Sequence, residues 1–243
     1  MKPPHASDAD PTSPWQRVTV AGLAMLCLAL IAAQVVNTSI IPEVAGFATV
    51  AGGLAIWVRR SASPIALLAA SASAAVLVVA NLPAATENLR HPESVASFVP
   101  TSTAIVLGVV VAASGVLATA RRAPRAARPT AAAAAGLIGL GVVVAGIASV
   151  SAHDDRQQGG DIVVDVRDSN YPDLTVPAGT NTFYVDNHDL IRHTLLIDGT
   201  DVDVEIPGST ARRIAVELEP GSYRYICDVI GHEAMVGVMT VDG

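Results

Sequence analysis

The sequence has very little cysteine, with only two among its 243 residues. Cys27 lies in an apolar run near the N-terminus and Cys227 lies near the C-terminus, so no disulfide framework can be read from them. Aromatic residues make up 4% of the chain and charged residues 15%, whereas 51% of the residues are hydrophobic. A composition this apolar and this poor in charge is typical of a chain that contains membrane spans.

Histidine is missing from the long apolar runs, and this absence excludes some classes of membrane protein. All six histidines lie outside those runs, whereas a haem bundle needs axial ligands, commonly histidines, within the membrane. The one carboxylate inside a run is Glu43, which lies near its outer edge, and an ion pump usually has buried ionisable residues. We therefore expect neither haem binding nor ion pumping from the apolar part.

Five apolar segments follow a polar N-terminal tail at residues 1–16, and each is near the ~20 residues that a helix needs to cross the hydrocarbon. The first is expected to be an uncleaved span, because its polar lead-in is long and no clear cleavage site follows. Gly141 and Ala145 are spaced for close helix packing or for pairing with another membrane subunit. The predicted spans, which together make a transmembrane domain at 17–150, are residues 17–36, 40–58, 64–82, 102–120 and 131–150.

Basic residues predict the orientation of these spans. They gather in the N-terminal tail, in the loop after the second span and in the loop after the fourth, which alternating spans place on one side. The opposite loops hold only Arg90. We therefore expect a multi-pass protein of the cell membrane, with its N-terminus in the cytoplasm and everything after Val150 outside the cytoplasm.

The charge balance divides the chain into a basic part and an acidic part. Residues 1–150 carry 5 acidic and 9 basic residues, whereas residues 151–243 carry 17 acidic and 6 basic residues. Residues 151–160 are polar and are expected to form a linker between the two parts. The outer loop at 83–101 contains Glu87, His91 and Glu93. Because surface charge clusters are usually solvation, we expect ordinary solvated residues there in preference to a metal-handover site.

Short strands with turns between them fill the last 83 residues. Apolar and polar residues alternate in two of these runs, and Pro-Gly or Asp-Gly pairs mark turns between others. Eight short strands without a convincing helix predict an all-β Greek-key sandwich at 161–243. The predicted strands are residues 161–167, 172–178, 181–187, 191–198, 202–206, 210–218, 221–227 and 235–242.

Three side chains that bind soft metals lie close together near the C-terminus. Cys227, His232 and Met235 place a thiolate, an imidazole and a thioether on one short loop between two strand-like runs. Two histidine nitrogens and one cysteine sulfur, with a weak axial methionine, form the set that holds copper for one-electron transfer. The second histidine is expected to be His193, which precedes an apolar run 34 residues before Cys227. We therefore predict one mononuclear copper site.

At these residues the sequence resembles the cupredoxins, the family of plastocyanin, azurin and amicyanin, over roughly its last third. In that family an early histidine and a late Cys, His, Met loop close on one copper at the end of a β-sandwich. The ending Met235-Val-Gly237 is similar to the amicyanin loop, whereas four residues between Cys227 and His232 are more similar to azurin. The axial ligand stays open at this point, with Met239 as the rival to Met235. Met239 lies within a strand-like run, where core packing is the usual role.

Residues beside the expected ligands are candidates to orient them. Asn187 and Thr194 flank His193 and either tie its loop to the Cys loop or serve as ordinary turn and strand residues. His188 is expected to be a surface histidine. An apolar rim and a nearby negative charge are expected around the copper, and the charge suits a basic redox partner. The rim residues are Leu190, Ile230 and Ala234, and the charged ones are Asp228 and Glu233.

The expected function is that of a membrane-anchored type 1 (blue) copper protein that carries single electrons on the extracytoplasmic side. We do not expect an enzyme, because copper oxidases and nitrite reductases have further histidine clusters and this chain has no His-x-His pair. The alternative is a domain that stores copper or delivers it to a membrane partner. A sandwich without metal, for adhesion or assembly, would require the ligand set to be coincidence. The expected partners are the lipid bilayer, a redox protein and another membrane subunit, with no nucleic acid.

Overall fold

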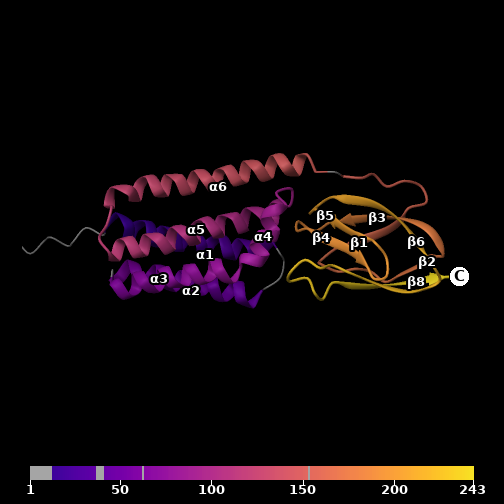
Figure 1. Ribbon diagram of the computed structural model, residues 1–243, viewed down its shortest axis with the longest axis horizontal. Helices are drawn as coiled ribbons and strands as arrows, with labels where there is room; N and C mark the ends of the chain where they lie inside the picture. The colour runs from indigo at the N-terminus through magenta and orange to yellow at the C-terminus, as the bar shows by residue number, and fades with distance from the viewer. Residues whose placement is uncertain (1–12, 37–40, 62, 153) are drawn as a thin grey trace, which may run out of the picture. The chain divides into compact units, whose positions relative to one another are not determined.

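The computed structural model describes residues 13–36, 41–61, 63–152 and 154–243, which divide into two compact units (Figure 1). The first unit contains helices only. The second unit joins Ala33–Ser39, Pro83–Thr101 and Leu140–Gly243, and it contains all of the strands. Most of the tail predicted at 1–16, and position 153 of the predicted linker, lie outside the described residues.

Helices occupy all five of the predicted apolar segments, and an additional short helix lies in the predicted outer loop. Several helices begin with proline, whose missing N–H is not needed in the first turn. Ser63 caps one of them, because its hydroxyl accepts the N–H of Ala66 at 3.1 Å. The elements are α1 (Pro14–Val36), α2 (Pro42–Ser61), α3 (Pro64–Ala80), α4 (Leu82–Arg90), α5 (Val95–Thr119), the 3-10 turn η1 (Pro124–Ala126) and α6 (Ala127–Val150).

By length and composition, three of the described helical segments can cross a membrane. They are α1, α5 and the continuous stretch Pro124–Val150 that contains α6. The pair α3 and α4 becomes a fourth span only if these two helices, bent by 60° at their junction, are taken as one. Helix α2 is not among them, and its last turn carries Arg59 and Arg60. Three of the five predicted spans thus have the expected properties, and the other two stay predictions.

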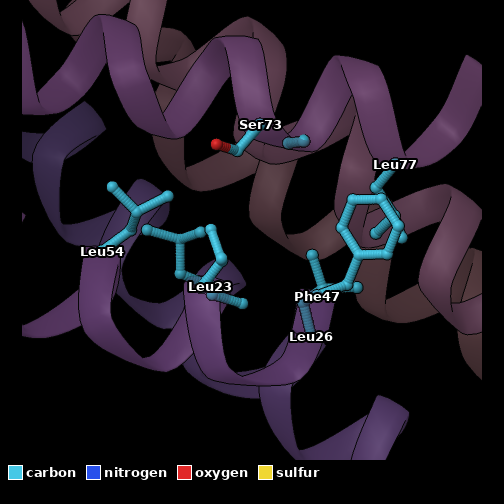
Figure 2. Close-up of a pocket in the computed structure, with 9 residues that line it drawn as sticks. Leu23, Leu26, Phe47, Leu54, Ser73 and Leu77 are labelled. Carbon is cyan, nitrogen blue, oxygen red and sulfur yellow. The ribbon is translucent and has the colours of Figure 1, made fainter. Parts of the chain in front are cut away.

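Small residues allow the helices of the first unit to pack closely. A Cβ on Gly115 of α5 would lie 2.3 Å from the Ser71 hydroxyl and 2.6 Å from the Leu67 carbonyl oxygen of α3. A cavity of about 10 Å³ remains between α1, α2 and α3, and Figure 2 shows its lining of leucines, Phe47 and Ser73. Since a single water needs roughly 10–15 Å³, this cavity has no room for a cofactor.

Two sheets form the β domain, and all eight predicted strands are present (Figure 1). The three-stranded sheet has the order β1 (Ile162–Val166), β3 (Gly179–Asn187), β6 (Ala211–Leu218). The five-stranded sheet has the order β2 (Leu174–Pro177), β8 (Val236–Asp242), β7 (Gly221–Ile226), β4 (His193–Ile197), β5 (Asp203–Ile206). A helical region followed by a sandwich-like β domain is therefore the observed fold class, as predicted.

The core of the β domain is built from alternate residues of the strands. In β8, for example, Gly237, Met239 and Val241 are buried and the residues between them are not, because successive side chains of a strand point to opposite faces. Strands β4 and β7 are antiparallel neighbours, with Leu196 opposite Ile226. The start of β4 and the end of β7 consequently meet at the same end of the sheet.

Candidate metal centre

Cys227 lies directly after β7 and is the centre of a group of metal-binding side chains. Its sulfur is 3.8 Å from Nδ1 of His193, the first residue of β4, and 3.5 Å from Nδ1 of His232 in the loop between β7 and β8. The sulfur and a ring nitrogen from each histidine all lie within 4.8 Å of one another. The structure thus brings together three residues that the sequence predicted to share one ion.

The spacing of these donor atoms fits a bound ion. A metal about 2.3 Å from a cysteine sulfur and about 2.0–2.1 Å from a histidine nitrogen holds the two roughly 3.6–3.8 Å apart at tetrahedral to trigonal angles. The two observed sulfur to nitrogen distances, 3.5 and 3.8 Å, lie close to that range. The sulfur of Cys227 and the nitrogens of the two histidines are therefore spaced nearly as they would be if all three bound one metal ion.

His193 is fully buried and is held by a carboxylate that sequence reasoning missed. Its Nε2 lies 2.9 Å from Oδ2 of Asp189, whereas its Nδ1 faces the Cys227 sulfur. Burial lowers the pKa of His193, and Asp189 partly opposes that shift. A neutral ring with its proton on Nε2, directed at the carboxylate, leaves the Nδ1 lone pair free for a metal. Asp189 is itself held by the backbone N–H groups of Asp168 and Ser169, each at 2.8 Å.

His232 is also held in the form that binds metals. Burial is the main cause that lowers its pKa to about 4, and the neighbouring His193 and Arg192 lower it further. A neutral imidazole is the metal-binding form, so little competition from protons is expected near neutral pH. The loop reaches this position through Gly231, whose φ of 95° is in the left-handed region that favours glycine.

Met235 completes a cluster that is like a type 1 site. Its carbonyl accepts the N–H of Cys227 at 3.1 Å, and its N–H donates to the carbonyl of His232 at 2.8 Å. Its side chain is 1% exposed and belongs to the same buried cluster as Cys227. Met239, the rival, lies within β8, where it faces Leu174 and Tyr223 on the neighbouring strands and packs in the core. Backbone hydrogen bonds thus join Met235, and not Met239, to Cys227 and His232, two of the expected ligands.

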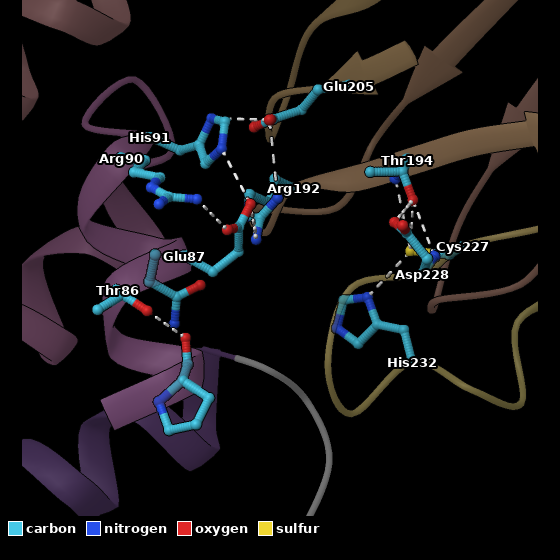
Figure 3. Close-up of polar contacts among 12 residues, drawn as sticks. Thr86, Glu87, Arg90, His91, Arg192, Thr194, Glu205, Cys227, Asp228 and His232 are labelled. Atoms are coloured by element: carbon cyan, nitrogen blue, oxygen red, sulfur yellow. Dashed lines mark hydrogen bonds and ion pairs between the residues drawn. The ribbon is translucent and has the colours of Figure 1, made fainter. Parts of the chain in front are cut away.

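Thr194 joins the two loops that carry the ligands (Figure 3). Its N–H points to the Cys227 sulfur at 3.4 Å. Its hydroxyl lies 2.7 Å from an Asp228 carboxylate oxygen and accepts the Asp228 N–H at 2.9 Å. The hydroxyl is also 3.7 Å from the sulfur, but its single proton is used in the much shorter contact with Asp228. The predicted tie between the His loop and the Cys loop is therefore made by Thr194.

Asn187 has its partners in the loop before His193 and in the turn after β5. Its amide nitrogen donates to the carbonyls of Ile191, Ile206 and Pro207 at 2.9–3.2 Å, and its oxygen accepts the Asp189 N–H at 3.0 Å. The side chain therefore fixes the loop before His193 to the turn after β5. Its hydrogen bonds do not reach the Cys loop, so of the two alternatives Asn187 is the turn residue and not the tie.

The remaining predicted neighbours lie outside the donor cluster. His188 is exposed, with Asp165 and Asp186 at 3.2 and 3.3 Å, as expected for a surface histidine. Leu190 and Ile230 are 60% and 59% exposed, which is compatible with the predicted apolar rim. The Glu233 carboxylate accepts the N–H of Gly231 at 3.0 Å, and backbone hydrogen bonds are the main cause that lowers its pKa. It consequently stays charged beside His232.

Gly208 is expected to be indispensable to the loop that carries His193. A Cβ at this position would lie 2.1 Å from the carbonyl oxygen of Leu190 and 2.5 Å from its carbonyl carbon. Since these are backbone atoms, the clash is relieved only if the loop moves. We expect Gly208→Ala to lower the free energy of unfolding by about 1–3 kcal/mol, measured by urea denaturation.

Gly221 offers the matched control for this substitution. Its added Cβ would meet nothing closer than a Tyr223 ring carbon at 3.8 Å, an ordinary van der Waals contact. Gly221→Ala should therefore leave the free energy of unfolding nearly unchanged. Equal stabilities for the two alanine variants would show that the close approach of Gly208 to Leu190 is not a constraint on the fold.

Two comparisons with known proteins give matches to the C-terminal part of this chain. Residues 137–241 match the family model of the cupredoxin-like domain. Similar solved structures include a Trp-to-Tyr variant of amicyanin in the reduced state and the Cu(I) form of a Met-to-Ala variant, each 26% identical over 35% of this chain and 86% of that chain, with TM-scores of 0.30. A Pro-to-Phe variant of reduced amicyanin has the same identity and coverage with a TM-score of 0.31. No curated protein matches.

Proposed function

We propose that this chain, whose residues 137–241 match the family model of the cupredoxin-like domain, is a membrane-anchored type 1 copper protein that carries single electrons outside the cytoplasm. The observation that carries the proposal is the convergence of one sulfur and two ring nitrogens within 4.8 Å of one another. His193, Cys227 and His232 would hold the ion, with Met235 as the weak axial ligand. Bound copper supplies the one-electron chemistry, because it is stable in both the cuprous and the cupric state.

Rigidity is the main contribution of the protein to this chemistry. Soft sulfur suits the reduced ion and imidazole the oxidised one, so a single frame can serve both states. His193 and Cys227 lie at the ends of two paired strands, and the His232 loop is closed by its own backbone hydrogen bonds to Val229 and Met235. A frame fixed in this way limits rearrangement when the charge of the ion changes.

Exposure differs among the ligands and predicts where electrons pass. His193, Cys227 and Met235 are at most 3% exposed, whereas His232 is partly exposed. The apolar rim beside it consists of exposed side chains, and Asp228 and Glu233 add negative charge. We expect a redox partner with a basic surface to dock on this face, because its positive charge would complement that of Asp228 and Glu233.

Anchoring in the membrane rests on the apolar helices and on the distribution of arginines. Three helical segments have the length and composition of spans, and we propose that the segments at 40–58 and 64–82 also cross, which gives five. An odd number of spans with a cytoplasmic N-terminus places the β domain outside the cytoplasm. We retain the proposed boundaries of 1–16, 17–150, 151–160 and 161–243 for the tail, spans, linker and copper domain.

A redox titration of the copper-loaded full chain tests the function. We expect one reversible one-electron transition per chain, accompanied by loss and recovery of an intense visible band. A domain for copper storage or delivery has no need of a cupric form. If the chain bound only cuprous ion and showed no intense visible band in any state, copper handling would replace electron transfer as the function.

The hydroxyl of Thr194 should matter both to stability and to the copper centre. Thr194→Val keeps the branched shape and the N–H to the sulfur, but removes both contacts with Asp228. We expect the free energy of unfolding to fall by about 1–2 kcal/mol and the visible band to shift or broaden. Thr200→Val is the control, since it removes a similar hydroxyl bond to Ile197 away from the centre. A visible band equally changed in both variants would contradict this role for Thr194.

A further inference from the structure

A second group of metal-binding side chains lies in the second compact unit, where the segment Pro83–Thr101 meets β5 (Figure 3). Nδ1 of His91 is 2.7 Å from an oxygen of Glu205 and 3.1 Å from an oxygen of Glu93. One donor atom from each of the three residues lies within 4.8 Å of the other two. Among the described residues, this arrangement is found only here and at the Cys227 centre.

The hydrogen bonds of this group cannot all be made at once. Glu93 and Glu205 both approach the same ring nitrogen of His91, and that nitrogen carries at most one proton. A third carboxylate, on Glu87, lies 3.3 Å from the other ring nitrogen. One imidazole therefore stands among three carboxylates, and at least one close pair of atoms lacks the proton that a hydrogen bond requires.

Cationic side chains compensate only part of the negative charge. The buried Arg192 lies 3.7 Å from both Glu87 and Glu205, which is long for an ion pair, and the exposed Arg90 lies 3.4 Å from Glu87. No arginine is within ion-pair distance of Glu93 among the described contacts. The group has room for further positive charge.

An unsatisfied buried oxygen provides an independent sign of a missing ligand. Oε1 of Glu205 is buried and has no hydrogen-bond partner. Leaving a buried acceptor without a partner costs about 1–3 kcal/mol, and more when the acceptor is charged. A cation bound by Glu205 would remove that penalty, because a carboxylate can offer either or both of its oxygens to an ion.

We propose that His91, Glu93 and Glu205 form a second metal site, for a divalent ion that prefers nitrogen and oxygen donors, with zinc as the occupant. Three protein ligands and one open position for water are a common arrangement for zinc, with bonds of about 2.0–2.2 Å. Two carboxylates supply two negative charges to balance those of the ion. The absence of sulfur from the set disfavours cuprous copper, so this site and the Cys227 centre select different ions.

The position of the site suggests what its occupation would do. Glu205 lies opposite Thr194 in the pairing of β5 with β4, and Arg192 is the residue before His193. A metal held by His91, Glu93 and Glu205 would therefore fix the segment Pro83–Thr101 to the edge strand β5. That strand lies directly beside the strand that begins with a ligand of the Cys227 centre.

Zinc binding to the full chain in detergent micelles tests the proposal. Wild type and variants are dialysed against buffered zinc, and bound metal is measured by mass spectrometry. We expect His91→Gln and Glu205→Gln to bind one zinc per chain fewer than wild type, or at least about tenfold more weakly. Cys227→Ser should retain this zinc, so the result does not depend on the proposed electron-transfer function.

His188→Gln is the matched control, because it removes another histidine that lies beside two carboxylates, those of Asp165 and Asp186, in the same compact unit. It should bind as much zinc as wild type. Circular dichroism of each variant reports whether the β domain is folded, and only folded variants enter the comparison. Zinc binding by His91→Gln at the wild-type stoichiometry and affinity, or an equal loss in His188→Gln, would overturn the proposed site.

Discussion

Replacement of Cys227 by serine is expected to abolish the intense visible band of the copper-loaded chain completely. That band requires a thiolate bound to cupric ion, and a serine hydroxyl remains protonated and cannot replace the sulfur. The side chain is 3% exposed and serine has nearly the same shape, so the β domain should stay folded. The measurement is the visible spectrum after addition of one equivalent of cupric ion.

Cys27 provides the control within the same chain. It is a free cysteine in α1. Among the described residues, the groups of metal-binding side chains include Cys227 but not Cys27. Cys27→Ser should therefore keep the full visible band. A band that survived in Cys227→Ser, or that disappeared in Cys27→Ser, would show that the thiolate has been assigned to the wrong residue.

Asn187→Ala is expected to be among the most destabilising single substitutions in the β domain. The side chain is 1% exposed, and its loss leaves three carbonyl oxygens and the N–H of Asp189 without their partner. We expect the free energy of unfolding to fall by about 2–4 kcal/mol, measured by urea denaturation. Because the same bonds hold the loop before His193, the affinity for copper should fall as well.

Asn181 lies at the other end of the same strand and gives a matched comparison. It is also buried, at 6% exposed, and donates to the carbonyls of Pro177 and Gly179. Asn181→Ala should lower stability by a smaller amount, and leave the copper affinity and the visible band unchanged. If the two variants lost equal amounts of copper affinity, Asn187 would have no specific part in placing His193.

Features that depend on local sequence were predicted well. The eight strands follow from alternation of polar and apolar residues between turns, and the helices follow from long apolar runs. Helix α4 was missed, because its nine residues lie in a polar loop and no long apolar face marks them. The count of spans depends on lengths and breaks that the apolar pattern does not resolve, such as the bend between α3 and α4.

The three donor residues of the metal centre were all predicted from the sequence, His193 with the support of the family resemblance, whereas contacts that arise only through the fold were missed. Cys227, His232 and Met235 lie on one loop, so their types and spacing were enough. Asp189 contacts His193 only because a turn brings residue i−4 back to the ring, and nothing in the sequence marks that contact. The approach of His91 to Glu205 depends on tertiary structure across more than a hundred residues, so these loop residues were expected to be merely solvated.

X-ray absorption at the copper edge of the copper-loaded full chain tests the central claim most directly. If His193, Cys227 and His232 bind one ion, the nearest shell must contain one sulfur and two nitrogens, and the sulfur must vanish in Cys227→Ser. A nearest shell of nitrogen and oxygen only, in the wild-type chain, would contradict the convergence of these three side chains on a single copper.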